Sequence, residues 1–379
     1  MFAVRLTAEW AAWVAALAAP LDRRCAWGLA SVVGGILLAP GRRTVTSWWR
    51  AAGITAGFRS YYYFLDGLGR KTAAGAAILF GLLRDRLDPG DRLLLAIDDT
   101  PTKRFGPKVQ GAGIHHNPTP GPADAKFLYG HSWVVLSRIA HHQRSGTIGL
   151  PLLGRLYIRD KDLPELPEAI GWTFRTKPQL AAELITWAGS LATGLTPRPW
   201  AVVDGAYANR EFLEPAQKAG FTVVARLRRD AKLFDLPPQL KPGERRGPGR
   251  PPTYGTNRLS LAKRAGQQRG WQTVDVVTTT GEGITKTVKS FLATWPPAGG
   301  VVRVVIVRES DGSWRAYLCT DPEASVGAIV QATLDRWGIE QDFHDLKEVE
   351  AIEQVQLRRV DSNVGAFNLN WWVHTLVEW

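Results

Sequence analysis

Acidic residues stand at two points of the chain where metal-dependent chemistry is possible. Asp98 and Asp99 directly follow the apolar run 93–97, and Asp204 directly follows the run 200–203. Both runs are typical of strands buried on both faces. A carboxylate at the end of a buried strand is costly unless it binds a cation, so two such placements raise the expectation of a metal site. The alternative is that each aspartate only caps the next turn or helix.

A third carboxylate, Glu340, lies on a predicted helix between two basic residues. Arg336, Glu340 and Lys347 are spaced i, i+4 and i+11, which places them on one stripe of a helix with 3.6 residues per turn. This pattern predicts one carboxylate for a metal ion, flanked by two cations for phosphates. The alternative is a solvated helix face with an ordinary Arg–Glu pair.

These motifs together resemble those of bacterial insertion-sequence transposases of the DDE type, which have a ribonuclease-H-like catalytic core. In that family the first aspartate precedes a threonine, so the resemblance selects Asp99 over Asp98, with Asp204 and Glu340 as the other catalytic residues. The stretch from His115 to His131 also resembles the DDE superfamily endonuclease branch. The matching segments are Ile97-Asp98-Asp99-Thr100, Val202-Val203-Asp204-Gly205-Ala206-Tyr207 and the helix with Arg336, Trp337, Ile339, Glu340, Phe343 and Lys347.

The helix departs from the family at one position. The family signature is Tyr-x-x-Arg-x-x-x-Glu-x-x-x-x-x-x-Lys, and Thr333 stands at the tyrosine position. The phosphate contact of that phenol is therefore not expected here, whereas the metal site is unaffected. The 136 residues that separate Asp204 from Glu340 (340 minus 204) fit the β-rich domain that the family commonly inserts between its second and third acidic residues.

The resemblance implies a DNA transposase that cuts and joins transposon ends. Asp99 would bridge two metal ions, with Asp204 and Glu340 holding one each, so that one ion activates water or a 3′-hydroxyl and the other stabilises the leaving oxygen. All-carboxylate ligation suits Mg²⁺, with Mn²⁺ as a substitute. Arg336 and Lys347 would clamp phosphates. The expected partners are double-stranded DNA with terminal inverted repeats and a second copy of the chain, in a homodimeric synaptic complex.

Composition is consistent with a DNA-acting protein. The chain of 379 residues is 45% hydrophobic, has a net charge of +12 and has room for two to three domains. Such a surplus favours a polyanion, with nucleic acid the first candidate and an anionic membrane the second, although a soluble enzyme can also be basic. The apolar run 25–40 is too short to span a bilayer. Cys25 and Cys319 have no metal-type spacing, and the histidines between 115 and 142 are irregularly spaced, so zinc is not expected. With only two distant cysteines, a reducing cytoplasm fits best, and a DNA-acting protein would lie at the nucleoid.

Further basic residues are candidate DNA contacts. Arg226, Arg228 and Arg229 lie after Asp204 and resemble the basic stretch that contacts transposon ends in related enzymes; the alternative is a solvated turn. Arg250, within Gly249-Arg250-Pro251, resembles a minor-groove AT-hook, although a flexible basic linker is the simpler interpretation.

The elements that must position these residues form an α/β fold with a ribonuclease-H-like mixed sheet. Residues 1–88 are predicted to be an all-helical DNA-binding domain. Its segment 44–52 has the features of a groove-reading helix or of an ordinary capped helix with inward-facing Trp48 and Trp49. Residues 89–235 form the first part of the catalytic core, with an irregular loop over 103–126. Strands are expected at 93–97, 133–139, 152–158, 200–203 and 222–227, and helices at 178–191 and 209–219.

The second half of the chain is predicted to interrupt the core and then complete it. Residues 236–322 comprise a basic linker, 240–258, and a β-rich insertion with strands at 271–280, 285–293, 301–308 and 313–320. Residues 323–379 return to the core as a helix over 324–349 and a final helix over 364–379. Because the chain stops inside that apolar helix, a truncated or inactive DNA-binding relative stays open as an alternative, as does a metal-dependent nuclease without strand transfer.

Overall fold

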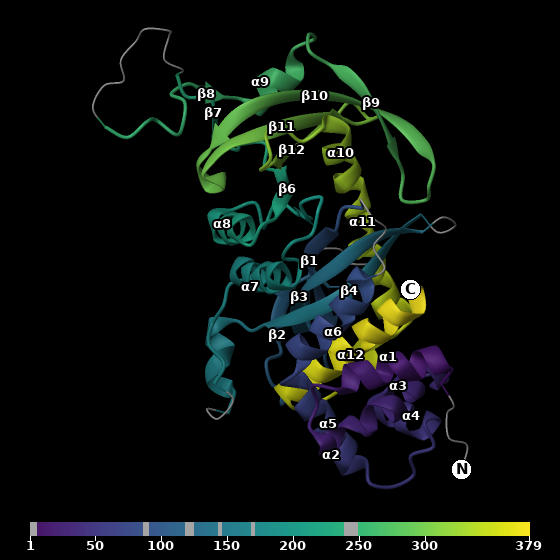
Figure 1. The fold of residues 1–379 in the computed structure, drawn as a ribbon. Helices are drawn as coiled ribbons and strands as arrows, with labels where there is room; N and C mark the ends of the chain where they lie inside the picture. Colours follow the sequence, from purple (N-terminus) through teal and green to yellow (C-terminus); the bar gives the residue numbers. More distant parts are fainter. Residues whose placement is uncertain (1–5, 86–90, 118–124, 143–145, 168–170, 239–248) are drawn as a thin grey trace.

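The computed structural model describes residues 6–85, 91–117, 125–142, 146–167, 171–238 and 249–379. The described residues up to 85 are helical, as expected, and gather at one end of the molecule (Figure 1). The predicted boundary at 88 lies outside the described residues. The helices are α1 (Ala8–Ala18), α2 (Arg23–Ala26), α3 (Gly28–Leu38), α4 (Val45–Ala51), α5 (Phe58–Gly69) and α6 (Thr72–Arg84).

Helix α4 begins with a capping residue and buries its tryptophans. The Thr44 hydroxyl accepts a hydrogen bond from the Ser47 backbone N–H at 3.2 Å, which satisfies one free donor of the first turn. Trp48 and Trp49 are both fully buried. This is the arrangement of an ordinary capped helix with its aromatic residues in the core.

The described strands form one continuous sheet in the order β2-β3-β1-β5-β6-β12-β11-β10-β7-β8, with β4 on β3 and β9 on β10. β1, β5 and β6 run parallel, and β3 pairs antiparallel with both β1 and β4. The strands of the first half are β1 (Leu94–Lys103), β2 (Gly113–His116), β3 (Phe127–His142), β4 (Gly146–Tyr157), β5 (Trp200–Val203) and β6 (Thr222–Leu227).

Two sequence predictions about this half were wrong. β1 does not end at Ile97 but continues through Asp98 and Asp99 to Lys103, because β3 keeps pairing with it as far as Lys103↔Gly130. The segment 103–126 is not wholly irregular, since residues 113–116 form β2, which pairs with the start of β3. Residues 118–124 of that segment lie outside the described residues.

The strands expected in the segment 236–322, which we call the insertion, are present and extend the sheet of the first half. β12 pairs antiparallel with β6, so the hydrogen bonding runs without a break from the core into the insertion. Residues 239–248 of the predicted basic linker, which include Arg245 and Arg246, lie outside the described residues. The elements are β7 (Leu233–Phe234), β8 (Arg258–Leu259), α9 (Leu261–Gly266), β9 (Gln272–Val277), β10 (Gly283–Trp295), β11 (Gly300–Arg308) and β12 (Trp314–Cys319).

Helices cover the sheet on both faces. α7 (Lys177–Leu191) and α8 (Arg210–Lys218) pack on one face, whereas α10 (Val326–Asp335) and α11 (Trp337–Glu348) pack on the other (Figure 1). The predicted helix 324–349 is therefore two helices, which meet at Arg336. Among the described residues, no helix is both long and apolar enough to cross a lipid bilayer.

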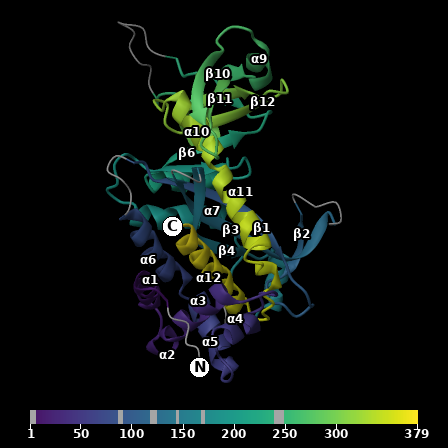
Figure 2. The same cartoon turned by 90° about the vertical axis from the view of Figure 1, so that its right-hand side faces the viewer.

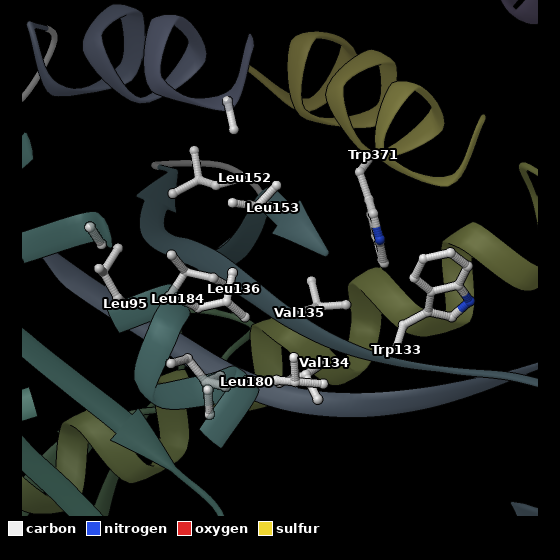
Figure 3. Close-up of a cluster of buried hydrophobic side chains, with 14 of the residues drawn as sticks. Leu95, Trp133, Val134, Val135, Leu136, Leu152, Leu153, Leu180, Leu184 and Trp371 are labelled. Atoms are coloured by element: carbon white, nitrogen blue, oxygen red, sulfur yellow. The ribbon is translucent and has the colours of Figure 1, made fainter. Parts of the chain in front are cut away.

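The last helix, α12 (Val360–Glu378), joins the N-terminal helices to the sheet. It lies between α5 and β4, and Figure 2 shows it alongside β4. The Asn368 side chain bonds both backbone groups of Gly154, at 2.8 and 3.1 Å. Phe367 stacks on Trp133 with ring centroids 3.8 Å apart. Figure 3 shows part of this core, in which buried leucines of β3, β4 and α7 belong to the same cluster as Trp133 and Trp371.

Candidate active site

The register of β1 and β5 brings two aspartates to the same edge of the sheet. The parallel pairing of these strands ends at Ile97↔Val203, so Asp98 and Asp204 are the next residues on the two strands at the same level. Carboxyl ends of neighbouring parallel strands are a common place for ligand-binding residues. The sequence prediction that Asp204 follows a buried strand is confirmed.

Asp98 faces α11 and meets a bridging arginine. Arg336 Nη1 lies 2.7 Å from Asp98 Oδ2, and Arg336 Nη2 lies 2.5 Å from Glu340 Oε1. Burial alone would lower the pKa of Arg336, but Asp98, Glu340 and Asp204 outweigh burial and raise it. The break between α10 and α11 therefore places a guanidinium among carboxylates from two faraway segments of the chain.

Asp99 points the opposite way, because successive side chains of a strand alternate between the faces of a sheet. Its Oδ2 lies 2.5 Å from Lys177 Nζ at the start of α7, and its Oδ1 accepts a hydrogen bond from the Tyr207 hydroxyl at 3.0 Å. Tyr207 is buried, and its pKa is raised well above the ordinary value by burial and by Asp99, Asp98 and Asp204.

We call Asp98, Asp99, Asp204 and Glu340 the carboxylate cluster. Burial raises the pKa of Asp98 to about 7 against the opposing effect of Arg336, and its neighbours Asp99 and Asp204 raise it further. Asp98 still keeps 21% of its side-chain surface exposed. Lys177 and Arg336 are the cations in direct contact with the cluster, so two negative charges stay uncompensated among these described residues when all of them are ionised.

The donor atoms of the carboxylate cluster suit a hard divalent cation, but basic side chains occupy the carboxylates in this structure. Its ligands are all carboxylate oxygens, as Mg²⁺ prefers. In the described part of the chain, no three His, Cys, Asp or Glu side chains are yet grouped closely enough to hold a metal ion. The physical reason is that Asp98 and Asp99 face opposite sides, and each is held by a basic side chain. An incoming ion would have to displace Lys177 or Arg336.

The other predicted contact residues are spread over the molecule. Arg226, at the end of β6, lines a cavity of about 340 Å³ together with Asp204 and Arg336, so the structure brings it to the cluster. Arg228 is exposed and lies 3.5 Å from Asp230. Arg250 lines a separate hollow beside Arg210 and Lys218 of α8.

Lys347 is not beside the cluster. It lies seven residues beyond Glu340 on α11, which is roughly 10 Å along the helix axis. Burial lowers the pKa of Lys347, Glu353 raises it, and Lys103 at the far end of β1 lowers it. Thr333, at the tyrosine position of the signature, lines the cavity that Arg226 shares with Asp204.

The sequence does not by itself assign a role to two residues of the site, Tyr207 and Lys177. The backbone N–H of Tyr207 donates to the Asp204 carbonyl at 3.1 Å, in the turn that carries the phenol to Asp99. One feature of the sequence could have indicated the role of Lys177. It lies in the first turn of a helix capped by Thr176, where the helix dipole disfavours a cation, so a carboxylate partner should have been expected.

Acidic residues at the end of β5, at the same level within β1 and on α11, faced by an arginine, form a site suited to phosphodiester chemistry. A sequence profile described as DDE superfamily endonuclease matches residues 17–289. This match covers more than half of the chain, which therefore belongs to the DDE superfamily endonuclease family.

Structural comparison finds several similar chains, one of which comes from a solved transposase complex of low overall similarity. The structure of piggyBac transposase in a synaptic complex with hairpin DNA, determined by cryo-EM, is 12% identical and has a TM-score of 0.37. The match covers 75% of this chain and 48% of that one, so the chain spans about half the length of that transposase. No curated protein matches the sequence.

Proposed function

We propose that the chain is a DNA transposase of the DDE type, which cuts phosphodiester bonds at transposon ends and rejoins them to target DNA. The observation that carries this proposal is the carboxylate cluster. Acidic side chains from β1, from the end of β5 and from α11 converge around one guanidinium. Membership of the DDE superfamily endonuclease family supports it, and so does a net charge of +12, which suits a polyanionic substrate.

The proposal includes Mg²⁺, or Mn²⁺ in its place, held by the carboxylate cluster. Bound there, such ions would lower the pKa of an attacking water or 3′-hydroxyl and stabilise the leaving oxygen. Asp98 is level with Asp204 in the sheet, and it contacts the same Arg336 that contacts Glu340. We therefore favour Asp98 as the metal ligand that β1 supplies on the α11 side of the sheet. Asp99, which the family resemblance favours, faces α7 and would bind a metal ion on that side only after Lys177 moves away. Tyr207 fixes the orientation of the Asp99 carboxylate, and Arg336, released from Asp98, would bind the scissile phosphate.

The wider assignments belong to the same proposal. The order β4-β3-β1-β5-β6, with β3 antiparallel to the parallel set β1, β5 and β6, supports a ribonuclease-H-like core. The helical segment 1–88 would bind DNA, the segments 89–235 and 323–379 would form the core, and 236–322 the insertion. The DNA would carry terminal inverted repeats, with Arg226, Arg228, Arg250 and Lys347 as further phosphate contacts, and the active assembly would be a homodimer.

The test uses labelled duplexes that carry the terminal repeats bordering the coding region, with and without Mg²⁺. The wild type is expected to cleave them only with the metal ion. The variants Asp204→Asn and Glu340→Gln should lose at least a hundredfold of this activity. Glu214→Gln, which removes an exposed carboxylate on α8, serves as the matched control and should cleave normally. Full cleavage by Asp204→Asn would refute the proposed site.

Asp98→Asn and Asp99→Asn compare the two candidates on β1. A severe loss for Asp98→Asn with a milder one for Asp99→Asn would match the register, and the reverse would match the family pattern. Products of the same reaction separate the alternatives. Joined strands indicate a transposase, nicks alone a nuclease, and shifted but uncut DNA a binding relative.

A further inference from the structure

The insertion carries an aromatic ring held between two cations. Trp271 lies with Arg308 Cζ 4.1 Å from its ring centroid and Lys289 Nζ 4.7 Å from it. The Lys289 ammonium also donates to the backbone carbonyls of Arg264 and Gln267, at 2.8 and 2.7 Å, so it closes the end of α9. Lys289 is buried, whereas Arg308 is exposed.

The same pattern recurs on both sides of Trp271. Arg264 Cζ lies 4.3 Å from the Phe291 ring, and Arg229 Cζ lies 5.0 Å from the Trp314 ring. The sheet register makes these pairs neighbours, because Arg308 is directly opposite Trp314 on β12. We call this continuous set the basic stripe. It consists of Arg229, Arg264, Lys289 and Arg308 with the rings of Trp271, Phe291 and Trp314.

The basic stripe lies on the face of the insertion opposite to the cavity that contains Asp204 and Arg336. Side chains alternate along a strand, and the neighbours Val307 and Arg315 line the cavity that contains Asp204. Arg308 and Trp314 therefore face the other side. Figure 1 agrees, since α9 covers the side of β10 opposite to α10.

Within the part of the chain that the structure describes, no carboxylate balances the charge of the stripe. Among the described residues, none of the guanidiniums of Arg229, Arg264 and Arg308 lies within 4.0 Å of a carboxylate. On the opposite face Lys286 and Arg315 are paired, since both contact Glu309. Burial lowers the pKa of Lys289, and the like charges of Arg308 and Arg264 lower it further. Grouping like charges in this way is unfavourable unless an anion binds there.

We propose that the basic stripe binds the phosphate backbone of a second DNA segment, separate from the segment at the carboxylate cluster. The rings are covered by the cations, so the surface offers guanidinium N–H groups rather than free aromatic faces for bases. Stacked guanidiniums are held in place and keep donors for phosphate oxygens. The contact is then independent of sequence and sensitive to salt. This inference rests on the proposed function only in taking the polyanion to be DNA.

The test measures binding of a fluorescent duplex of unrelated sequence, in EDTA, over a series of KCl concentrations. Each phosphate contact contributes about 0.9 to the slope of log affinity against log salt, so Arg264→Gln with Arg308→Gln should lower the slope by roughly 2. Arg308→Lys keeps the positive charge, so this variant should keep most of the contribution of Arg308 to the slope. Arg210→Gln removes an exposed arginine of α8 and serves as the matched control, with an unchanged slope expected. Urea denaturation checks that each variant is folded.

The outcomes separate this inference from the proposed function. If the folded double variant has the same slope as the wild type, the basic stripe is not a DNA-binding surface, whatever the result of the cleavage assay. An equal loss for Arg210→Gln would overturn it too, because the effect would then follow net charge alone. A reduced slope in the double variant, together with lost cleavage in Asp204→Asn and normal affinity of that variant, would support two separate DNA contacts.

Discussion

The closest approach between α11 and the sheet allows a sharp test of how Glu340 is positioned. Gly149 on β4 lies under α11, and a Cβ added there would meet Asp342 Oδ2 at 2.0 Å and Oδ1 at 2.2 Å. Gly338 of α11 lies against the backbone of the same strand. Only a residue without a side chain allows the helix to lie this close. We therefore predict that Gly149→Ala moves α11 outward.

The cost follows from the burial of Asp342. Its side chain is fully enclosed and faces His374 of α12 at 3.7 Å, so it has no free space in which to move aside. Overpacking of a core costs about 1–3 kcal/mol, and a disturbed buried ion pair adds to that. We expect Gly149→Ala to lower the free energy of unfolding by about 2–4 kcal/mol. Because Glu340 is two residues away, a shift of about 1 Å should also reduce cleavage roughly a hundredfold.

Urea denaturation and the metal-dependent cleavage assay measure the two effects, and Gly327→Ala is the control. Gly327 lies within α10 with nothing inside 4 Å of an added Cβ, so alanine there should stabilise the helix by about 0.5–1 kcal/mol and leave cleavage unchanged. If Gly149→Ala were as stable and as active as the wild type, the close packing of α11 on β4 would not position Glu340.

Three further predictions concern the carboxylate cluster without metal. The pKa of Asp98 is raised to about 7, so between pH 5 and 7 the folded chain keeps a proton that the unfolded chain has lost. The free energy of unfolding of the wild type therefore falls as the pH rises through this range. Asp98→Asn lacks this proton, so urea titrations should show it gaining about 2–3 kcal/mol relative to the wild type from pH 5 to pH 8. A flat difference would contradict this assignment. Lys177→Gln frees Asp99 and should tighten Mn²⁺ binding about tenfold or more by electron paramagnetic resonance; weaker binding would show that Lys177 helps to build the site. Tyr207→Phe removes a buried hydrogen bond to a carboxylate and should cost about 1–2 kcal/mol in unfolding free energy, with no change meaning that water replaces the phenol.

Local sequence patterns were sufficient for the strands and helices that alternate along the core. The predicted bounds of the strands 200–203 and 222–227 agree with the structure, because short runs rich in Val and Ala between turn signals leave few alternatives. Asp98, Asp99 and Asp204 could be identified for the same reason, because each lies beside an apolar run. A carboxylate next to an apolar run is visible in the sequence alone.

Long-range pairing explains what the sequence did not reveal. The extent of β1 depends on the 16-residue strand β3 beside it, so neither the end of β1 nor the opposite orientations of Asp98 and Asp99 could be read from local propensity. The break at Arg336 is also set from outside, because Asp98, 238 residues earlier, holds the guanidinium. The union of core and insertion through β6 and β12 is likewise a contact between segments that no local pattern joins.

The position of α12 gives the chain an order of assembly during synthesis. Asp66 on α5 accepts hydrogen bonds from Arg359 and from Ser362, which follow it by 293 and 296 residues. A ribosome adding about 5–20 residues per second needs roughly 15–60 s to cover that interval. Throughout this time the N-terminal helices lack their partner, and so does the outer side of β4 from the moment that β4 has been made. A nascent chain released before α12 emerges would therefore expose apolar surface on both. Chaperones would bind such a chain or proteases would degrade it, and it would not reach the folded state.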